Sequence, residues 1–266
     1  MIKTINKKIA KIDKRYRFGI SAVILTSLMA FSTSFYFNKA FIFIPLFIIV
    51  AYLLTYFSIL EDIEKIEWFS LFFMPVLLTV AFYLFYFLFP GRWLTRLPFV
   101  IFYAISIYAM LLSSNIFNVG VEKSLQLYRA AFSVNFLYHT IVIFLIFSLI
   151  LSLKLLFIFN FVLSAILIFL MGIHLFWTIR LKPFIERESI MYAIFLSLIL
   201  SEIVIVLSFV PLNVSIFALF IAGSYYSLAG LIYTFLDQRL FKETIREYLF
   251  VWGFVFLIML LSFNWQ

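Results

Sequence analysis

Long runs of apolar residues recur along the whole chain, separated by short stretches that carry charges or turn-forming residues. A helix that crosses the hydrocarbon core of a bilayer needs about 20 mostly apolar residues, because each residue adds about 1.5 Å. The runs that meet this requirement predict about nine transmembrane helices. Their predicted bounds are Phe18–Phe37, Ala40–Leu60, Trp68–Phe89, Leu97–Asn115, Ala130–Leu153, Leu155–Ile179, Ile190–Val210, Leu212–Leu236 and Tyr248–Phe263.

Two of these boundaries fall within apolar stretches that have no obvious loop. Lys154 is the one charged residue within residues 130–178, and Pro211 and Asn213 interrupt residues 190–236. Either stretch would measure about 70 Å as a single helix, more than twice the hydrocarbon thickness of about 30 Å. Proline disfavours helical geometry at the preceding residue and has no backbone N–H. We therefore expect a tight helical hairpin in each stretch.

Composition places the chain among membrane proteins. Of its 266 residues, 66% are hydrophobic and 12% are charged, and the mean hydropathy is +1.17. An ordinary soluble domain carries about 25% charged residues, which cover its water-facing surface. The sequence therefore predicts an all-α, polytopic membrane bundle surrounded by the lipid bilayer. We expect a basic tail over residues 1–17, followed by a single transmembrane domain over residues 18–266.

Basic residues are distributed unevenly between the two sides of the predicted bundle. If the spans alternate in direction, the N-terminal tail and every second loop hold 16 of the 20 Lys and Arg residues. Loops rich in Lys and Arg remain in the cytoplasm. The pattern therefore predicts a multi-pass protein of the cell membrane, with its N-terminus in the cytoplasm and its C-terminus on the exterior.

Several kinds of chemistry are missing from the sequence. The chain has no cysteine, which excludes disulfides, thiolate metal sites and thiol nucleophiles. Its two histidines, His139 and His174, belong to no HExxH motif. The chain also has no glycine-rich phosphate loop and no GxSxG motif. These absences count against an enzyme, and we expect no cofactor, no metal and no nucleic-acid partner.

Glu202 is the one carboxylate of the twelve that lies within a predicted span. A charged group near the bilayer centre costs about 2.5–3.5 kcal/mol on insertion scales, so it usually faces the bundle or a water-filled cavity. Glu202 is therefore a candidate proton or cation site. The alternative is a protonated glutamic acid that forms hydrogen bonds between helices, with Ser197 and Ser201 nearby on the same span.

A second group of polar residues leads into the fifth span. At 100° per residue, one narrow stripe contains Glu122, Gln126, Arg129, Ser133 and Thr140. Asn135 and His139 form an i,i+4 pair on a neighbouring face. One interpretation is a vestibule that binds a polar or anionic group, with Arg129 as its electrostatic anchor. The other is an amphipathic helix start at the membrane surface, followed by hydrogen bonds between helices.

Small residues form a third pattern. Gly223, Ser227 and Gly230 have i, i+4, i+7 spacing on the eighth span. Small side chains let helix backbones approach closely, so this strip predicts packing within the bundle or between protomers. His174 stands alone in the sixth span, where a single His more often donates one hydrogen bond than relays protons.

These residues are compatible with two functions, both of which we favour over an intramembrane enzyme. The first is a membrane-embedded subunit or scaffold of a larger complex, whose partners are other proteins or further copies of this chain. The alternative is a small carrier or channel for a solute or lipid-like molecule, along a path lined by Glu202, Arg129 and His139. A carrier predicts that these residues converge on one water-accessible cavity. A scaffold predicts that they form separate pairwise contacts.

Overall fold

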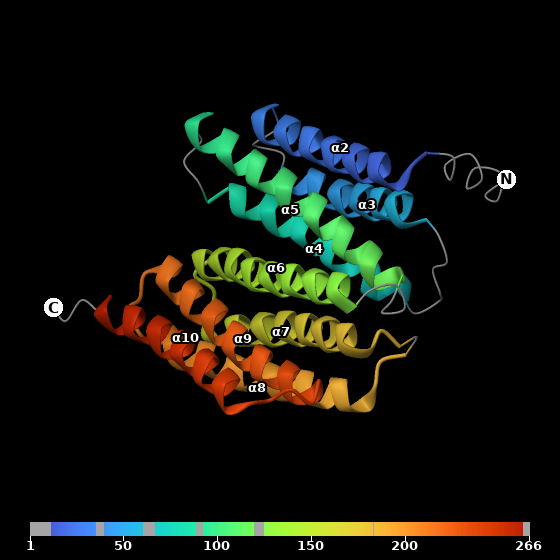
Figure 1. Ribbon diagram of the computed structural model, residues 1–266. Coiled ribbons are helices and arrows are strands. Elements are labelled where there is room, and N and C mark those ends of the chain that lie inside the picture. Colours follow the sequence, from blue (N-terminus) through green and yellow to red (C-terminus); the bar gives the residue numbers. More distant parts are fainter. Residues whose placement is uncertain are drawn as a thin grey trace. The chain divides into compact units, whose positions relative to one another are not determined.

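The structure, a computed structural model, describes residues 12–35, 40–60, 67–88, 93–119, 125–182 and 184–262. Helices make up most of the described chain (Figure 1). In chain order they are α2 (Lys14–Phe35), α3 (Ala40–Ile59), α4 (Glu67–Tyr86), α5 (Trp93–Val119), α6 (Leu125–Ser152), α7 (Phe157–Arg180), α8 (Arg187–Ser208), α9 (Val214–Leu236) and α10 (Lys242–Leu261). All nine described helices are long and apolar enough to cross a membrane. The predicted all-α polytopic membrane fold is confirmed.

The helix ends differ from the predicted spans by a few residues. Helix α2 begins within the predicted tail, and α10 begins at Lys242 rather than at Tyr248. Helices do not stop at the edge of an apolar run, because Lys, Arg and Glu are themselves good helix formers. Residues 1–11 of the tail, and the predicted span ends at Phe37, Phe89 and Phe263, lie outside the described residues.

The helix breaks at both of the predicted turns. Helix α6 ends at Ser152 and α7 begins at Phe157. Between them, Lys154 turns the chain with a φ angle of 50°. Between α8 and α9, Asn213 caps the second helix by accepting a hydrogen bond from the Ser215 backbone N–H at 3.1 Å. These short connections leave no room for a further element between neighbouring helices.

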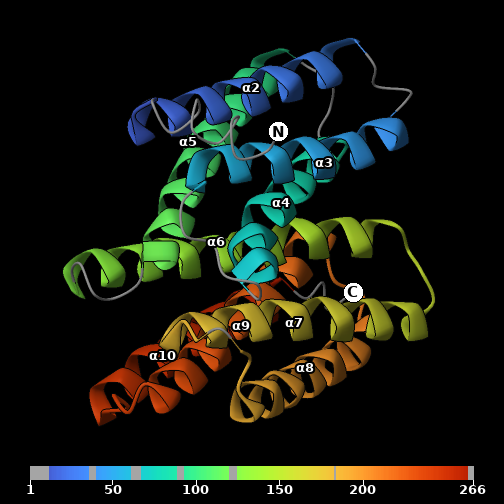
Figure 2. The same cartoon turned by 90° about the vertical axis from the view of Figure 1, so that its right-hand side faces the viewer.

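The chain forms two compact units, Met1–Tyr138 and His139–Gln266, and the boundary between them falls within α6. In the first unit, α2, α3, α4 and α5 pack against one another. In the second unit, α7 packs mainly against α8, and α9 packs against α10 (Figure 2). The single transmembrane domain expected over residues 18–266 stays a prediction.

Hydroxyl groups connect the helices of the first unit. The Ser21 and Ser58 hydroxyls of α2 and α3 hydrogen-bond at 2.9 Å, and Tyr103 of α5 donates to Thr79 Oγ1 of α4 at 3.0 Å. All four side chains are buried. Lipid tails are as apolar as leucine side chains, so hydrogen bonds and close packing replace the hydrophobic effect in holding membrane helices together.

The second unit also relies on small residues and single hydrogen bonds. A Cβ atom built on Gly172 of α7 would lie 3.3 Å from the Ala193 Cβ of α8, so these backbones approach closely. One turn from Ala193, Ser197 Oγ donates to Ala165 O at 2.9 Å. On the other side of the unit, Trp252 of α10 donates its indole N–H to Ser224 Oγ of α9 at 3.2 Å.

Candidate functional site

Glu202 is exposed on α8. Its neighbours on the same face of the helix are apolar and 49% to 65% exposed: Met191, Phe195, Leu198 and Val206. The nearby serines bond elsewhere, Ser197 to α7 and Ser201 to Leu198 O of its own helix. Within the part of the chain that the structure describes, Glu202 therefore faces neither the bundle nor a serine partner.

The polar stripe at the start of α6 is also exposed. Gln126, Arg129 and Ser133 all lie on the surface, and Ser133 Oγ donates to Arg129 O of the same helix at 3.0 Å. Glu122, the first member of the stripe, lies outside the described residues. Gln126, Arg129 and Ser133 belong to the first unit, where they are exposed rather than enclosed, whereas Thr140, the last member of the stripe, is half-buried and belongs to the second unit.

His139 and His174, 35 residues apart in the sequence, form a buried contact in the second unit. His174 Nδ1 of α7 lies 3.0 Å from His139 Nε2 of α6, and the ring centroids are 5.0 Å apart. His174 is 3% exposed and His139 is 0% exposed. The sequence predicts a hydrogen-bonding role for His174, and the structure gives His139 of another helix as its partner. Asn135, one turn before His139 on α6, is buried as well.

The short nitrogen–nitrogen distance defines the chemistry of this pair. A neutral imidazole has one N–H donor and one acceptor nitrogen, so a hydrogen bond of 3.0 Å requires one ring to carry the shared proton and the other to accept it. The tautomers of the two rings are consequently coupled. The described residues place no third His or carboxylate in a metal-binding group with them. The pair is thus a direct imidazole–imidazole hydrogen bond between two helices.

Glu202 and His139 differ in exposure, although both belong to the second unit. Glu202 is exposed, whereas His139 is completely buried against His174. Arg129 belongs to the first unit. The structure therefore brings His139 to a partner that the sequence pattern did not indicate, and leaves Glu202 on the surface.

The predicted packing strip lies where α9 meets α10. A Cβ atom on Gly223 would lie 2.9 Å from Val255 Cγ2, and a Cβ atom on Gly230 would overlap the Tyr248 ring. Ser227, between the two glycines, is buried. The absence of side chains at both glycines thus permits the close approach of these two helices.

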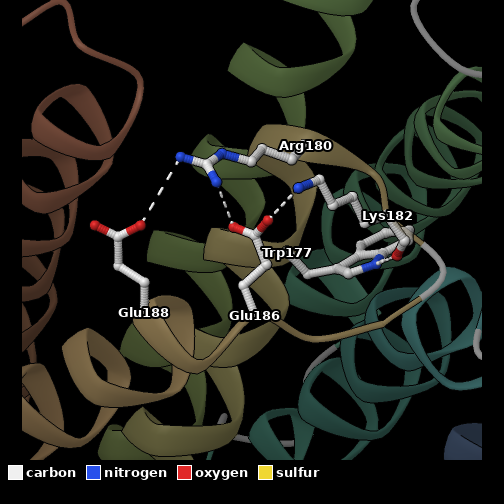
Figure 3. Close-up of polar contacts among 5 residues, drawn as sticks. All are labelled: Trp177, Arg180, Lys182, Glu186 and Glu188. Carbon is white, nitrogen blue, oxygen red and sulfur yellow. Dashed lines mark hydrogen bonds and ion pairs between the residues drawn. The ribbon is translucent and has the colours of Figure 1, made fainter.

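A group of charged residues closes the connection between α7 and α8 (Figure 3). The Glu186 carboxylate lies between Arg180 and Lys182, hydrogen-bonding to Arg180 Nη1 at 2.7 Å through one oxygen and to Lys182 Nζ through the other. Arg180 Nη2 also lies 3.8 Å from Glu188. Trp177 donates its indole N–H to Lys182 O at 2.9 Å. These contacts hold the short loop against the end of α7.

The hydrogen bond from Lys182 is the largest of the effects that lower the pKa of Glu186 below its ordinary value, followed by the contacts with Arg180, while burial opposes them. A lowered folded-state pKa contributes stability above the ordinary value of 4.5, and this contribution disappears as pH falls through the folded-state pKa. We expect Glu186→Gln to cost about 0.2–1 kcal/mol at neutral pH, because ion pairs near the surface are weak.

Thermal unfolding in mild detergent at a series of pH values checks this expectation. The wild type and Glu186→Gln should differ at neutral pH and converge in acid. Glu188→Gln is the matched control, since its pair with Arg180 is longer and its side chain is 47% exposed, and it should have a smaller effect. A deficit of Glu186→Gln that persists unchanged in acid would show that its cause is not the ion pair.

Comparison with protein-family models, with curated proteins and with solved structures finds no match for this chain. The class that the fold defines is a multi-pass α-helical membrane protein.

Proposed function

We propose that this protein is a membrane-embedded subunit of a larger protein complex, and that the outer face of α8 contacts another subunit. The observation that carries this proposal is the exposure of Glu202 among exposed apolar residues. A face that is apolar except for one carboxylate is unfavourable in contact with lipid alone. It is favourable when a partner covers it and supplies a group that binds the carboxylate.

The distance of Glu202 from the end of α8 also favours a contact with a partner. It lies six residues before Ser208, the last residue of α8, and therefore about 9 Å inside that end of the helix. A long basic side chain can extend to the membrane surface, whereas the shorter Glu side chain has less reach. A charge in the hydrocarbon costs up to about 2.5–3.5 kcal/mol, with the largest values near the centre. A contact with a partner would remove much of this cost.

The partner that fits this face is a membrane-spanning helix of another protein that carries Lys or Arg at the depth of Glu202. A basic group would neutralise the carboxylate and form a charge-assisted hydrogen bond. A second copy that presented the same face across a two-fold axis would place one Glu202 opposite another. Two neighbouring carboxylates disfavour each other's ionisation, so the identical face is a poorer complement than a basic one.

The arrangement of the candidate site residues favours a subunit over a carrier. A carrier needs its polar residues to line one water-accessible path, and Glu202 and His139 have opposite exposures within one unit. We further propose that the complex resides in the cell membrane, with the N-terminus in the cytoplasm and the C-terminus on the exterior. The distribution of Lys and Arg along the sequence supports this orientation.

Site-specific photo-cross-linking in native membranes tests the proposed contact. A photoreactive residue at Leu198 or Val206, on either side of Glu202, should cross-link to a peptide from another protein's membrane span that contains Lys or Arg. In the Glu202→Leu background, the yield should fall about tenfold or more, which corresponds to about 1.4 kcal/mol. Glu202→Gln should give an intermediate yield, because the amide retains hydrogen bonding but not charge.

The matched control is the same photoreactive residue at Ile166 of α7, an exposed apolar position on another helix. It should not cross-link to the same peptide. A product of two copies of the 31.4 kDa chain would assign the face to self-association and contradict a heterologous partner. Cross-links to lipid alone at Leu198 and Val206, unchanged by Glu202→Leu, would reject the subunit contact.

A further inference from the structure

A pocket of about 430 Å³ opens in the second unit, where the turn between α6 and α7 meets the turn between α8 and α9. Its lining includes buried Leu151, Leu207 and Phe217. The aromatic rings of Phe157 and Phe209, also in the lining, lie with their centroids 5.4 Å apart and are largely exposed. Apolar side chains therefore make up most of the pocket's lining and its exposed rim.

Three polar side chains break this apolar lining: Lys154, Asn160 and Ser208. Asn160 is 6% exposed, and its Oδ1 accepts no hydrogen bond from the described residues. Lys154 is exposed in the turn, and its ammonium group forms no ion pair within the described part of the chain. Ser208 donates its hydroxyl hydrogen to Val204 O at 2.7 Å, which leaves its oxygen available as an acceptor.

These groups specify the chemistry of a ligand. The Lys154 ammonium attracts an anion, and phosphate is an anion that lysine binds well. A buried acceptor without a hydrogen bond is unfavourable, so Asn160 Oδ1 favours a ligand that brings an O–H or N–H donor. The apolar side chains of the lining favour hydrocarbon. A molecule with all three features has an anionic, hydroxylated or aminated head and an apolar tail.

The size of the pocket limits how much of such a molecule can enter. The pocket volume is about 430 Å³. It lies within the range of about 300–1,000 Å³ that is typical of small-molecule sites. A lipid head group and the first methylene groups would fit, and the remaining acyl chain would lie outside, along exposed apolar residues such as Leu156 and Phe209.

We propose that this pocket binds the head group of an anionic phospholipid. The phosphate contacts Lys154, a hydroxyl or amine of the head group donates to Asn160 Oδ1, and the first methylene groups pack on Leu207 and Phe217. The exposed apolar rim favours a lipid over a free phosphate compound, because the acyl chain gains contacts that a soluble molecule lacks. Lipid binding here is independent of the proposed partner contact at Glu202.

Native mass spectrometry of the full-length protein, equilibrated with equal amounts of phosphatidylglycerol and phosphatidylcholine, tests the proposal. Phosphatidylglycerol has a net negative charge and head-group hydroxyls, whereas phosphatidylcholine has neither. The wild type should retain phosphatidylglycerol preferentially. Lys154→Gln should lower the ratio of the two bound lipids about tenfold, and Asn160→Leu should also lower it.

Lys242→Gln is the matched control, since Lys242 is another exposed lysine near a helix end but does not line the pocket. It should leave the ratio unchanged. If Asn160→Leu fails to fold, Lys154→Glu, at an exposed position, should still abolish the preference. Equal retention of both lipids by the wild type, or an unchanged ratio in Lys154→Gln, would overturn the proposal. Displacement of the lipid by soluble glycerol 3-phosphate would overturn the lipid assignment and identify a site for a free phosphate compound.

Discussion

Gly223→Ala should destabilise the protein, whereas the same substitution at Gly253 should not. A Cβ atom at Gly223 would lie 2.9, 3.1 and 3.2 Å from the three side-chain carbons of Val255, and Val255 is buried. Valine in a helix has one strongly preferred rotamer, so the strain cannot be relieved by rotation and α10 must move. We expect a loss of about 1–3 kcal/mol in the free energy of unfolding relative to Gly253→Ala, as for other overpacked sites.

Gly253→Ala is the control because it makes the same chemical change on α10, where a Cβ atom would meet nothing within 4 Å. Both variants gain the same helix propensity, so the difference between them isolates the contact with Val255. Adding Val255→Ala removes the two closest carbons and should recover part of the loss. The free energies can be measured by reversible unfolding in mixed detergent micelles. Equal stabilities of Gly223→Ala and Gly253→Ala would mean that α9 and α10 do not pack as closely as the structure shows.

Gly230→Ala should have a smaller effect than Gly223→Ala, although its Cβ atom would approach Tyr248 even more closely. The atoms that it meets are at the far end of the tyrosine ring, and Tyr248 is only half-buried. A rotation of that side chain can make room. The spacing of small residues thus indicates where helices pack, but the neighbour determines how costly a substitution is.

The spans could be predicted from the sequence because length alone constrains them. The stretches around Lys154 and Pro211 were too long for one helix, and the helix indeed breaks at both places. The start of α10 could not be placed in the same way. Residues 242–247 are mostly polar, so they lie outside an apolar run, yet they belong to the helix.

The orientation of Glu202 could not be predicted because apolar residues predominate on every side of α8. A helix with one polar face can be oriented from its pattern, but the residues around Glu202 give no contrast between faces. Small residues mark the face of α8 that packs against α7. Ala193 and Ser197 face α7, and Glu202 lies on a different face from both.

The histidine pair could have been found by counting from the turn between α6 and α7. His139 lies 13 residues before the last residue of α6, Ser152, and His174 lies 17 residues after the first residue of α7, Phe157. At 1.5 Å per residue, the two are about 20 and 26 Å from the turn, a difference of about one helical turn. Two helices that fold back at this turn bring such residues to similar depths. Which face each histidine occupies still required the structure.

His139→Leu and His174→Leu should each lower the free energy of unfolding by about 1–3 kcal/mol. Each substitution removes the ring to which the other buried imidazole is hydrogen-bonded. The double variant should cost about 0.5–1.5 kcal/mol less than the sum of the two single variants, because the shared hydrogen bond is lost once, not twice. This range is consistent with hydrogen bonds between membrane helices. Unfolding of all four proteins in mixed micelles gives the coupling directly.

A control double-mutant cycle combines Ser164→Ala with a histidine substitution. Ser164 is buried on α7, but it lies ten residues, or about 15 Å, before His174, and its hydroxyl donates to Phe161 O of the same helix. Combined with His139→Leu, Ser164→Ala should be additive within about 0.5 kcal/mol. His139→Gln should be more stable than His139→Leu, since glutamine offers both a donor and an acceptor and so suits either tautomer of His174. Additive losses in the histidine cycle, together with equal stabilities of the Gln and Leu variants, would show that the two rings are neighbours without a stabilising hydrogen bond.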